Sequence, residues 1–80
     1  MNKAASIKSR LRRALNGRGA GQTATIAQVG DNGASIAMGA WTLDLTFSDL
    51  NDDGDPATQP EQDAIFSSLQ QIVTEHNAAV

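Results

Sequence analysis

Residues 41–48 constrain the fold more than any other stretch, because large apolar side chains alternate there with small or polar ones. Successive side chains of a β-strand point to opposite faces, so this alternation predicts a strand with one dry face and one wet face. The dry face contains the only tryptophan of the chain and one of its two phenylalanines. We expect the rest of the fold to cover this face, which is formed by Trp41, Leu43, Leu45 and Phe47.

The length of 80 residues predicts one domain with a small core, because so short a chain buries only about 60–65% of the surface that it exposes when unfolded. The sequence has no cysteine, so disulfides and thiolate metal sites add no stability. Self-association would add buried area, and a homo-oligomer is therefore an alternative to a monomer. Because the chain opens with Met1, we expect a complete short reading frame.

No part of the sequence approaches the roughly 18 consecutive apolar residues of a membrane span. The N-terminal basic residues interrupt apolar positions instead of preceding an apolar run, which differs from a secretory signal. We therefore expect no membrane partner, and a location in the cytoplasm or within a larger particle such as a virion.

Residues 2–16 predict a helix, because apolar side chains recur there at spacings of three and four and share one stripe. Asn16 and Gly17 suit its end, because glycine readily adopts the left-handed conformation that closes many helices. The stripe consists of Ala4, Ile7, Leu11, Ala14 and Leu15.

Two loop signals separate three predicted strands. Residues 30–33, Gly-Asp-Asn-Gly, follow a strand at residues 23–29, and their Asn-Gly pair favours a two-residue type I′ loop. A second strand at residues 34–38 leads into residues 39–40, Gly-Ala, which suit a type II′ turn into residues 41–48. A bulge in one long bent strand is the alternative to this second turn.

The second loop fixes one strand register. A two-residue loop at residues 39–40 places Met38 opposite Trp41 and Ile36 opposite Leu43, all on one face.

The first loop fixes the other register. A two-residue loop at residues 32–33 pairs Val29 with Ile36 and directs Ile26 away from the core, so that Ile26 becomes a candidate for contact with a partner.

Residues 58–77 give the clearest predicted helix. Thr58 and Glu61 form a capping box, in which each side chain satisfies an unpaired backbone donor, and proline is tolerated in the first turn. We expect the helix to fray over residues 77–80. Its apolar stripe consists of Ile65, Phe66, Leu69, Ile72 and Val73. Core positions without a functional role are predicted at Trp41, Phe47, Phe66, Leu69 and Ile72.

The predicted order is an N-terminal helix, a three-stranded antiparallel β-meander and a C-terminal helix, which is an α+β fold of two layers. We expect both helices on the face of the sheet that carries Trp41. The single domain then divides into the basic helix and linker at residues 1–18, the meander at residues 22–48 and the C-terminal helix at residues 58–77.

The charges of the chain are separated along the sequence. All six lysines and arginines lie in the first 18 residues, and all nine acids follow them, so the net charge of −3 combines a head of +6 with a body of −9. Such asymmetry indicates an electrostatic partner. The predicted contact residues are Lys8, Arg10, Arg12, Arg13 and Arg18.

A protein partner, or the acidic body of a second subunit, is the preferred interpretation of this basic stretch. Binding to the phosphates of a nucleic acid is an alternative, although no aromatic residues are interleaved and no zinc-finger, helix-turn-helix or RNP pattern accompanies it. A solvated face without a partner is another. The acidic body suggests one further alternative, in which the chain mimics a nucleic acid as a small inhibitor.

Residues 49–55, Asp-Leu-Asn-Asp-Asp-Gly-Asp, follow the pattern Asp-x-Asn-x-Asp-Gly and resemble the opening of an EF-hand or dockerin-type calcium loop. They depart from it because Pro60 occupies the twelfth position and a strand leads into the loop. A polar connection rich in turn-forming residues is the alternative. The resemblance implies weak Ca²⁺ binding by Asp49, Asn51, Asp53 and Asp55.

Catalysis has little support in the sequence. His76 is the only histidine and is expected at a solvated, fraying terminus, and no serine lies in a recognisable nucleophile motif. We therefore interpret the chain as a small non-enzymatic binding or assembly protein that contacts an acidic partner through its basic N-terminal helix. Its size and composition are typical of the short proteins that phages and mobile elements encode.

Overall fold

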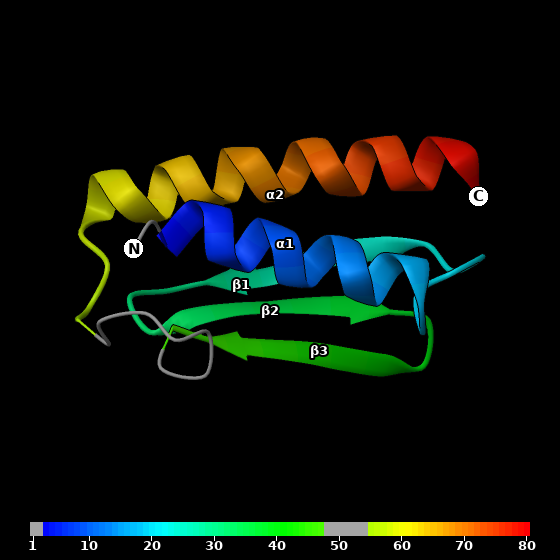
Figure 1. Ribbon diagram of the computed structural model, residues 1–80, viewed down its shortest axis with the longest axis horizontal. Helices are drawn as coiled ribbons and strands as arrows, with labels where there is room; N and C mark the ends of the chain where they lie inside the picture. The colour runs from blue at the N-terminus through cyan, green and yellow to red at the C-terminus, as the bar shows by residue number, and fades with distance from the viewer. Residues whose placement is uncertain (1–2, 48–54) are drawn as a thin grey trace.

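The computed structural model describes residues 3–47 and 55–80. The order of its elements is helix, three strands, helix, as predicted (Figure 1). The elements are α1 (Lys3–Asn16), β1 (Ala24–Val29), β2 (Gly33–Met38), β3 (Trp41–Thr46) and α2 (Gln59–Ala79).

The molecule has two layers, with both helices against one face of the sheet. The sheet has the strand order β1-β2-β3, and each neighbouring pair is antiparallel. Figure 1 shows α1 and α2 running side by side along the sheet. The sheet and both helices share one core, whose members with less than 2% exposure include Ile7, Leu11, Ile36, Met38, Ile65 and Leu69.

Strand β3 has the predicted faces. Leu45 and Phe47 are buried, and Trp41 and Leu43 pack against the same core while partly exposed. The intervening side chains are exposed and form part of the open face of the sheet, which neither α1 nor α2 covers: Thr42, Asp44 and Thr46.

The turn between β2 and β3 is also confirmed. Met38 lies opposite Trp41 and Ile36 opposite Leu43, so the chain reverses at residues 39–40 and the bent-strand alternative is wrong. Gly39 has a φ of +58°, a positive value that favours glycine at the first position of such a loop.

The predicted register between β1 and β2 is wrong. Val29 lies opposite Ala34, and the Gly30 N–H donates to the Gly33 carbonyl at 2.9 Å, so the two loop residues are 31 and 32. Gly33 belongs to the strand, where a Cβ atom would lie 1.9 Å from the Leu45 carbonyl oxygen. The close approach of β3 therefore explains why glycine occupies this position.

A bulge in β1 reverses the expected position of Ile26. The register shifts between Ile26 and Gln28, so Ala27 is an additional residue relative to β2. Ile26 consequently packs against the core, whereas Ala27 is exposed. The predicted register required Ile26 to face outward on the open face of the sheet, and this prediction is wrong.

Helix α1 buries its predicted stripe. Ile7 and Leu11 are fully buried and Leu15 is 4% exposed, and each such side chain contributes about 1.5–3 kcal/mol through the area that it removes from water. The helix also buries Lys3, which is 7% exposed and which the apolar pattern did not place in the core.

Helix α2 begins with the predicted capping box. The Glu61 N–H donates to the Thr58 hydroxyl oxygen at 3.3 Å, and the Thr58 N–H donates to the Glu61 carboxylate at 2.9 Å. The expected fraying of residues 77–80 is wrong, because the helix continues to Ala79. Its last turn is held by Asn77, whose side chain bonds to the backbone of Ala24 in β1.

Phe66 is an error in the predicted core, because it is 46% exposed. Successive helix residues are about 100° apart, so Phe66 lies at the border of the stripe that is centred on Ile65, Leu69 and Ile72. At this border the helix adjoins the outer edge of β1, and no described element covers the ring.

Candidate functional site

The candidate site is the basic face of α1 and the turn after it, defined by Lys8, Arg10, Arg12, Arg13 and Arg18. The structure brings these five residues to one side of the molecule because the apolar stripe of α1 faces the core. The four arginines are exposed, and Lys8 is partly buried.

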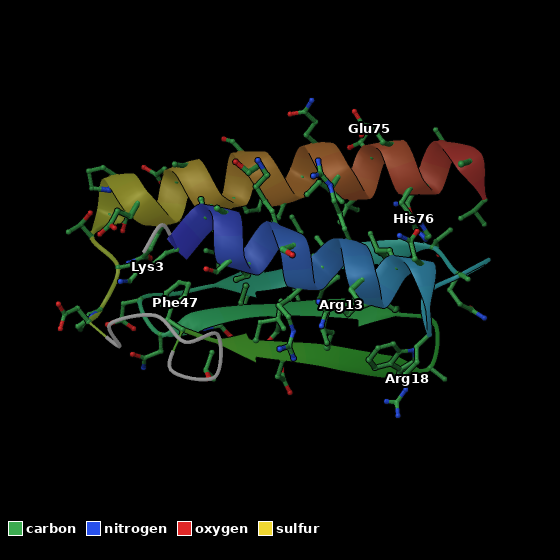
Figure 2. The ribbon with its side chains drawn as sticks, viewed as in Figure 1. Lys3, Arg13, Arg18, Phe47, Glu75 and His76 are labelled. Carbon is green, nitrogen blue, oxygen red and sulfur yellow. The ribbon has the colours of Figure 1, made fainter. Side chains whose placement is uncertain are left out.

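The basic face has two flanks. Residues three or four apart lie on one side of a helix, so Arg10 and Arg13 form one flank, and Lys8 and Arg12 form the other. Figure 2 shows Arg13 on the side of α1 that faces β3, where Arg18 also lies. The first flank therefore continues into the turn and presents three guanidinium groups: Arg10, Arg13 and Arg18.

Two cations of the N-terminal segment are held against aromatic rings. The Arg18 guanidinium lies 5.2 Å from the centre of the Trp41 ring, and the Lys3 ammonium lies 5.6 Å from that of Phe47. Cation–π contacts of this kind contribute about 0.5–1 kcal/mol at exposed sites. Arg18 thus covers the partly exposed ring of Trp41. Lys3 is buried, so its positive charge does not belong to the basic face.

The other cations of the face have no acidic partner in the described part of the chain. Within residues 3–47 and 55–80, the side chains of Lys8, Arg10, Arg12 and Arg13 form neither a salt bridge nor a hydrogen bond. All acids that the structure describes are exposed and lie beyond α1: Asp31, Asp44, Asp55, Glu61, Asp63 and Glu75. These four cations are therefore not neutralised by the acids that the structure describes.

The predicted calcium ligands Asp49, Asn51 and Asp53 lie outside the described residues, and Asp55 is exposed at the start of the second described range. In the described ranges, no group of three or more histidine or acidic side chains is arranged to hold a metal ion. The calcium interpretation stays a prediction.

His76 occupies a defined position that the sequence did not indicate. Its Nε2 atom lies 2.6 Å from the Gln22 carbonyl oxygen, so the imidazole fastens α2 to the segment before β1. The neighbouring Asn77 fastens the same helix to Ala24. The expectation of a solvated, fraying terminus is therefore wrong, and both residues serve packing.

Sequence reasoning missed a groove between β1 and α2, with a volume of about 360 Å³. Ile26 and Val29 line it from the strand, and Asp63 and Phe66 line it from the helix. The available signal was the position of Phe66 at the border of the helical stripe. A second hollow, on the open face of the sheet, contains the hydrogen bond from the Ser35 hydroxyl to the Asp44 carboxylate at 2.7 Å.

Comparison of the chain with protein-family models, curated proteins and solved structures gives no match.

Neither helix in the described part of the chain combines the length and the apolarity that are needed to cross a membrane.

Proposed function

We propose that the chain is a small non-enzymatic binding or assembly protein whose basic face docks on an acidic surface of a protein partner. One observation carries the proposal: four exposed or partly exposed cations of α1 have no acidic partner among the described residues of a chain that contains nine acids. The nine acids of the chain could have neutralised these cations by forming ion pairs within the molecule. Because the described acids do not, the unpaired cations favour a partner outside the chain.

The overall charge supports a protein partner over a nucleic acid. The net charge of −3 and the acidic surface beyond α1 repel a polyanion that extends past the basic face. Proteins that bind single-stranded nucleic acid also stack bases on aromatic rings, and the ring beside the basic face, that of Trp41, is covered by Arg18. A protein with a local acidic patch can contact the cations of α1 without approaching the acidic residues elsewhere on this chain.

The test uses two polyanions as probes: labelled polyglutamate of about six residues, which is short enough to stay within the basic face, and a DNA duplex of about 20 base pairs, which extends past it. Their binding is measured by fluorescence anisotropy in about 0.1 M NaCl, where charges interact over roughly 10 Å. We expect polyglutamate to bind and the double variant Arg10→Gln/Arg13→Gln to bind it about tenfold more weakly, because exposed charge pairs contribute up to about 1 kcal/mol each and two of them account for at most about a thirtyfold loss.

A matched control distinguishes the effect of losing cations on the basic face from the effect of a changed net charge. Ser67→Glu/Gln71→Glu makes the same change in total charge at two exposed positions of α2, so its affinity for polyglutamate is expected to fall less than threefold. An equal loss in both double variants, or no binding by the unmodified protein, refutes the proposal. Tighter binding of the duplex than of polyglutamate would assign the face to a nucleic acid.

A further inference from the structure

β1 is an edge strand, and within residues 3–47 and 55–80 its outer side is hydrogen-bonded only at its first residue. The side-chain amide of Asn77 accepts a hydrogen bond from the Ala24 N–H at 2.8 Å and donates one to the Ala24 carbonyl at 2.9 Å. These are the two bonds that a residue of a neighbouring strand would make. Asn77 therefore takes the place of a fourth strand at Ala24, and it shows that the backbone groups of Ala24 point away from β2.

The described part of the chain leaves the rest of the outer edge without hydrogen-bond partners. Backbone groups in an antiparallel strand alternate between the two sides, so those of Ile26 point outward like those of Ala24. The Gly30 N–H is directed inward, to Gly33 of the hairpin, and the groups of Val29 before it consequently point outward. No described residue forms a hydrogen bond with these outward groups of Ile26 and Val29.

The groove between β1 and α2 runs along this open part of the edge. Its helical wall contributes Phe66, which is 46% exposed, and the carboxylate of Asp63, which accepts a hydrogen bond from Gln59 at 2.9 Å. Neither charge nor proline protects the strand, whose sequence is Ala-Thr-Ile-Ala-Gln-Val, although both devices are common on exposed edges. The site combines backbone donors and acceptors, an apolar ring and one anion.

We propose that this groove binds an extended peptide segment of a partner protein by adding it to the outer edge of β1. Backbone hydrogen bonds to Ile26 and Val29 would align the segment, as in other cases of strand addition. Its apolar side chains would contact Phe66, and a lysine or arginine would pair with Asp63. The surface is separate from the basic face of α1, so the inference does not depend on the proposed function.

Charge complementarity selects a basic segment over a second copy of this edge. After Arg18 the sequence contains no lysine or arginine, so the charged side chains of α2 are acidic, and β1 has none. A symmetric pairing of two β1 edges would bring the Asp63 carboxylates of both copies into one interface, where like charges repel. A basic extended peptide removes this repulsion.

The experiment titrates the full chain with the peptide acetyl-Lys-Val-Lys-Val-Lys-Val-Lys-amide and follows backbone amides by NMR. We expect the largest shift changes in β1 and around Phe66, and at least tenfold slower hydrogen exchange at the amides of Ile26 and Val29. The same peptide with proline at the central valine should lose binding, because proline lacks the donor that strand pairing requires.

Variants at exposed positions test the groove without disturbing the core. Asp63→Asn and Phe66→Ala should each weaken peptide binding at least fivefold, whereas Glu75→Gln and Gln70→Ala on the same helix should change it less than twofold. Equal effects of Asp63→Asn and Glu75→Gln, or full binding of the proline peptide, would reduce the interaction to charge attraction and overturn the proposal. So would absence of binding at about 1 mM peptide, or a dimer in light scattering that Phe66→Ala dissociates.

Discussion

Gly33 is a residue whose lack of a side chain is required by a contact between strands. A Cβ atom there would lie 1.9 Å from the Leu45 carbonyl oxygen and 2.9 Å from the Thr46 Cα, and both contacts involve backbone that cannot rotate away. We expect Gly33→Ala to destabilise the fold by at least about 2 kcal/mol, because overpacking that shifts a backbone costs about 1–3 kcal/mol or more. Thermal unfolding should show a decrease in Tm of roughly 10 °C.

Gly30→Ala is the matched control for this substitution, since the nearest atom to its added Cβ is 3.8 Å away, on the side chain of Gln28. Its stability should stay within about 1 kcal/mol of the original. Similar decreases in Tm for both variants would show that the hairpin is sensitive to any side chain in the loop, and that the contact with β3 is not the cause.

Asn77 joins the end of α2 to the edge of β1 by two hydrogen bonds. Asn77→Ala would leave the N–H and carbonyl of the buried Ala24 without their partners, and an unsatisfied buried polar group costs about 1–3 kcal/mol. We expect a loss of this size in urea denaturation, with Asn77→Asp intermediate because it keeps the acceptor alone. A loss below about 0.5 kcal/mol for Asn77→Ala would mean that water replaces both bonds.

At the scale of elements, β3 determines which side of the sheet is dry. Leu45 is 4% exposed, and a carboxylate in its place would be buried without a partner. We expect Leu45→Asp to abolish the cooperative thermal transition, because the cost of several kcal/mol is comparable to the total stability of a small domain. Thr42→Asp, on the exposed face of the same strand, should unfold cooperatively. A folded Leu45→Asp variant would contradict the assignment of the faces.

The elements that the sequence predicts correctly are those specified by local patterns. The alternation that begins at residue 41, the stripe of α1 and the capping box of α2 each depend on residues close in sequence, and the structure confirms all three, the alternation as far as residue 47. The register of β1 depends instead on a bulge and on the contact of Gly33 with β3. Those contacts join residues distant in sequence, so the Asn-Gly pair alone placed the loop one residue too late.

The candidate site was predictable in its charges and unpredictable in its surroundings. Four of the five cations lie in the predicted helix and Arg18 follows it, but the ring beneath Arg18 and the burial of Lys3 depend on tertiary packing. The groove beside Phe66 likewise depends on tertiary packing, because its two walls come from β1 and α2, which are distant in the sequence. Periodicity identifies the apolar stripe of a helix. How much of that stripe other elements bury depends on the whole fold.

At the scale of the whole molecule, charge separation makes two copies of the chain complementary to each other. The basic face of α1 and the exposed acids beyond it belong to one small molecule of 8.4 kDa, so the acidic partner that we propose includes a second copy of this chain. A contact between these unlike surfaces is heterologous and leaves a free basic face at one end. Such a contact builds chains or rings, which is the geometry of an assembly protein.

Molar mass by light scattering on a sizing column tests this association. In about 0.1 M NaCl we expect a mass above 8.4 kDa that rises with protein concentration, and in about 1 M NaCl a monomer, because the screening length decreases from roughly 10 Å to roughly 3 Å. Arg10→Gln/Arg13→Gln should be monomeric in both, and Ser67→Glu/Gln71→Glu should still associate at low salt. A monomer at both salt concentrations would leave the acidic partner to a different protein, and an oligomer that persists in 1 M NaCl would show that apolar contacts, instead of charges, join the copies.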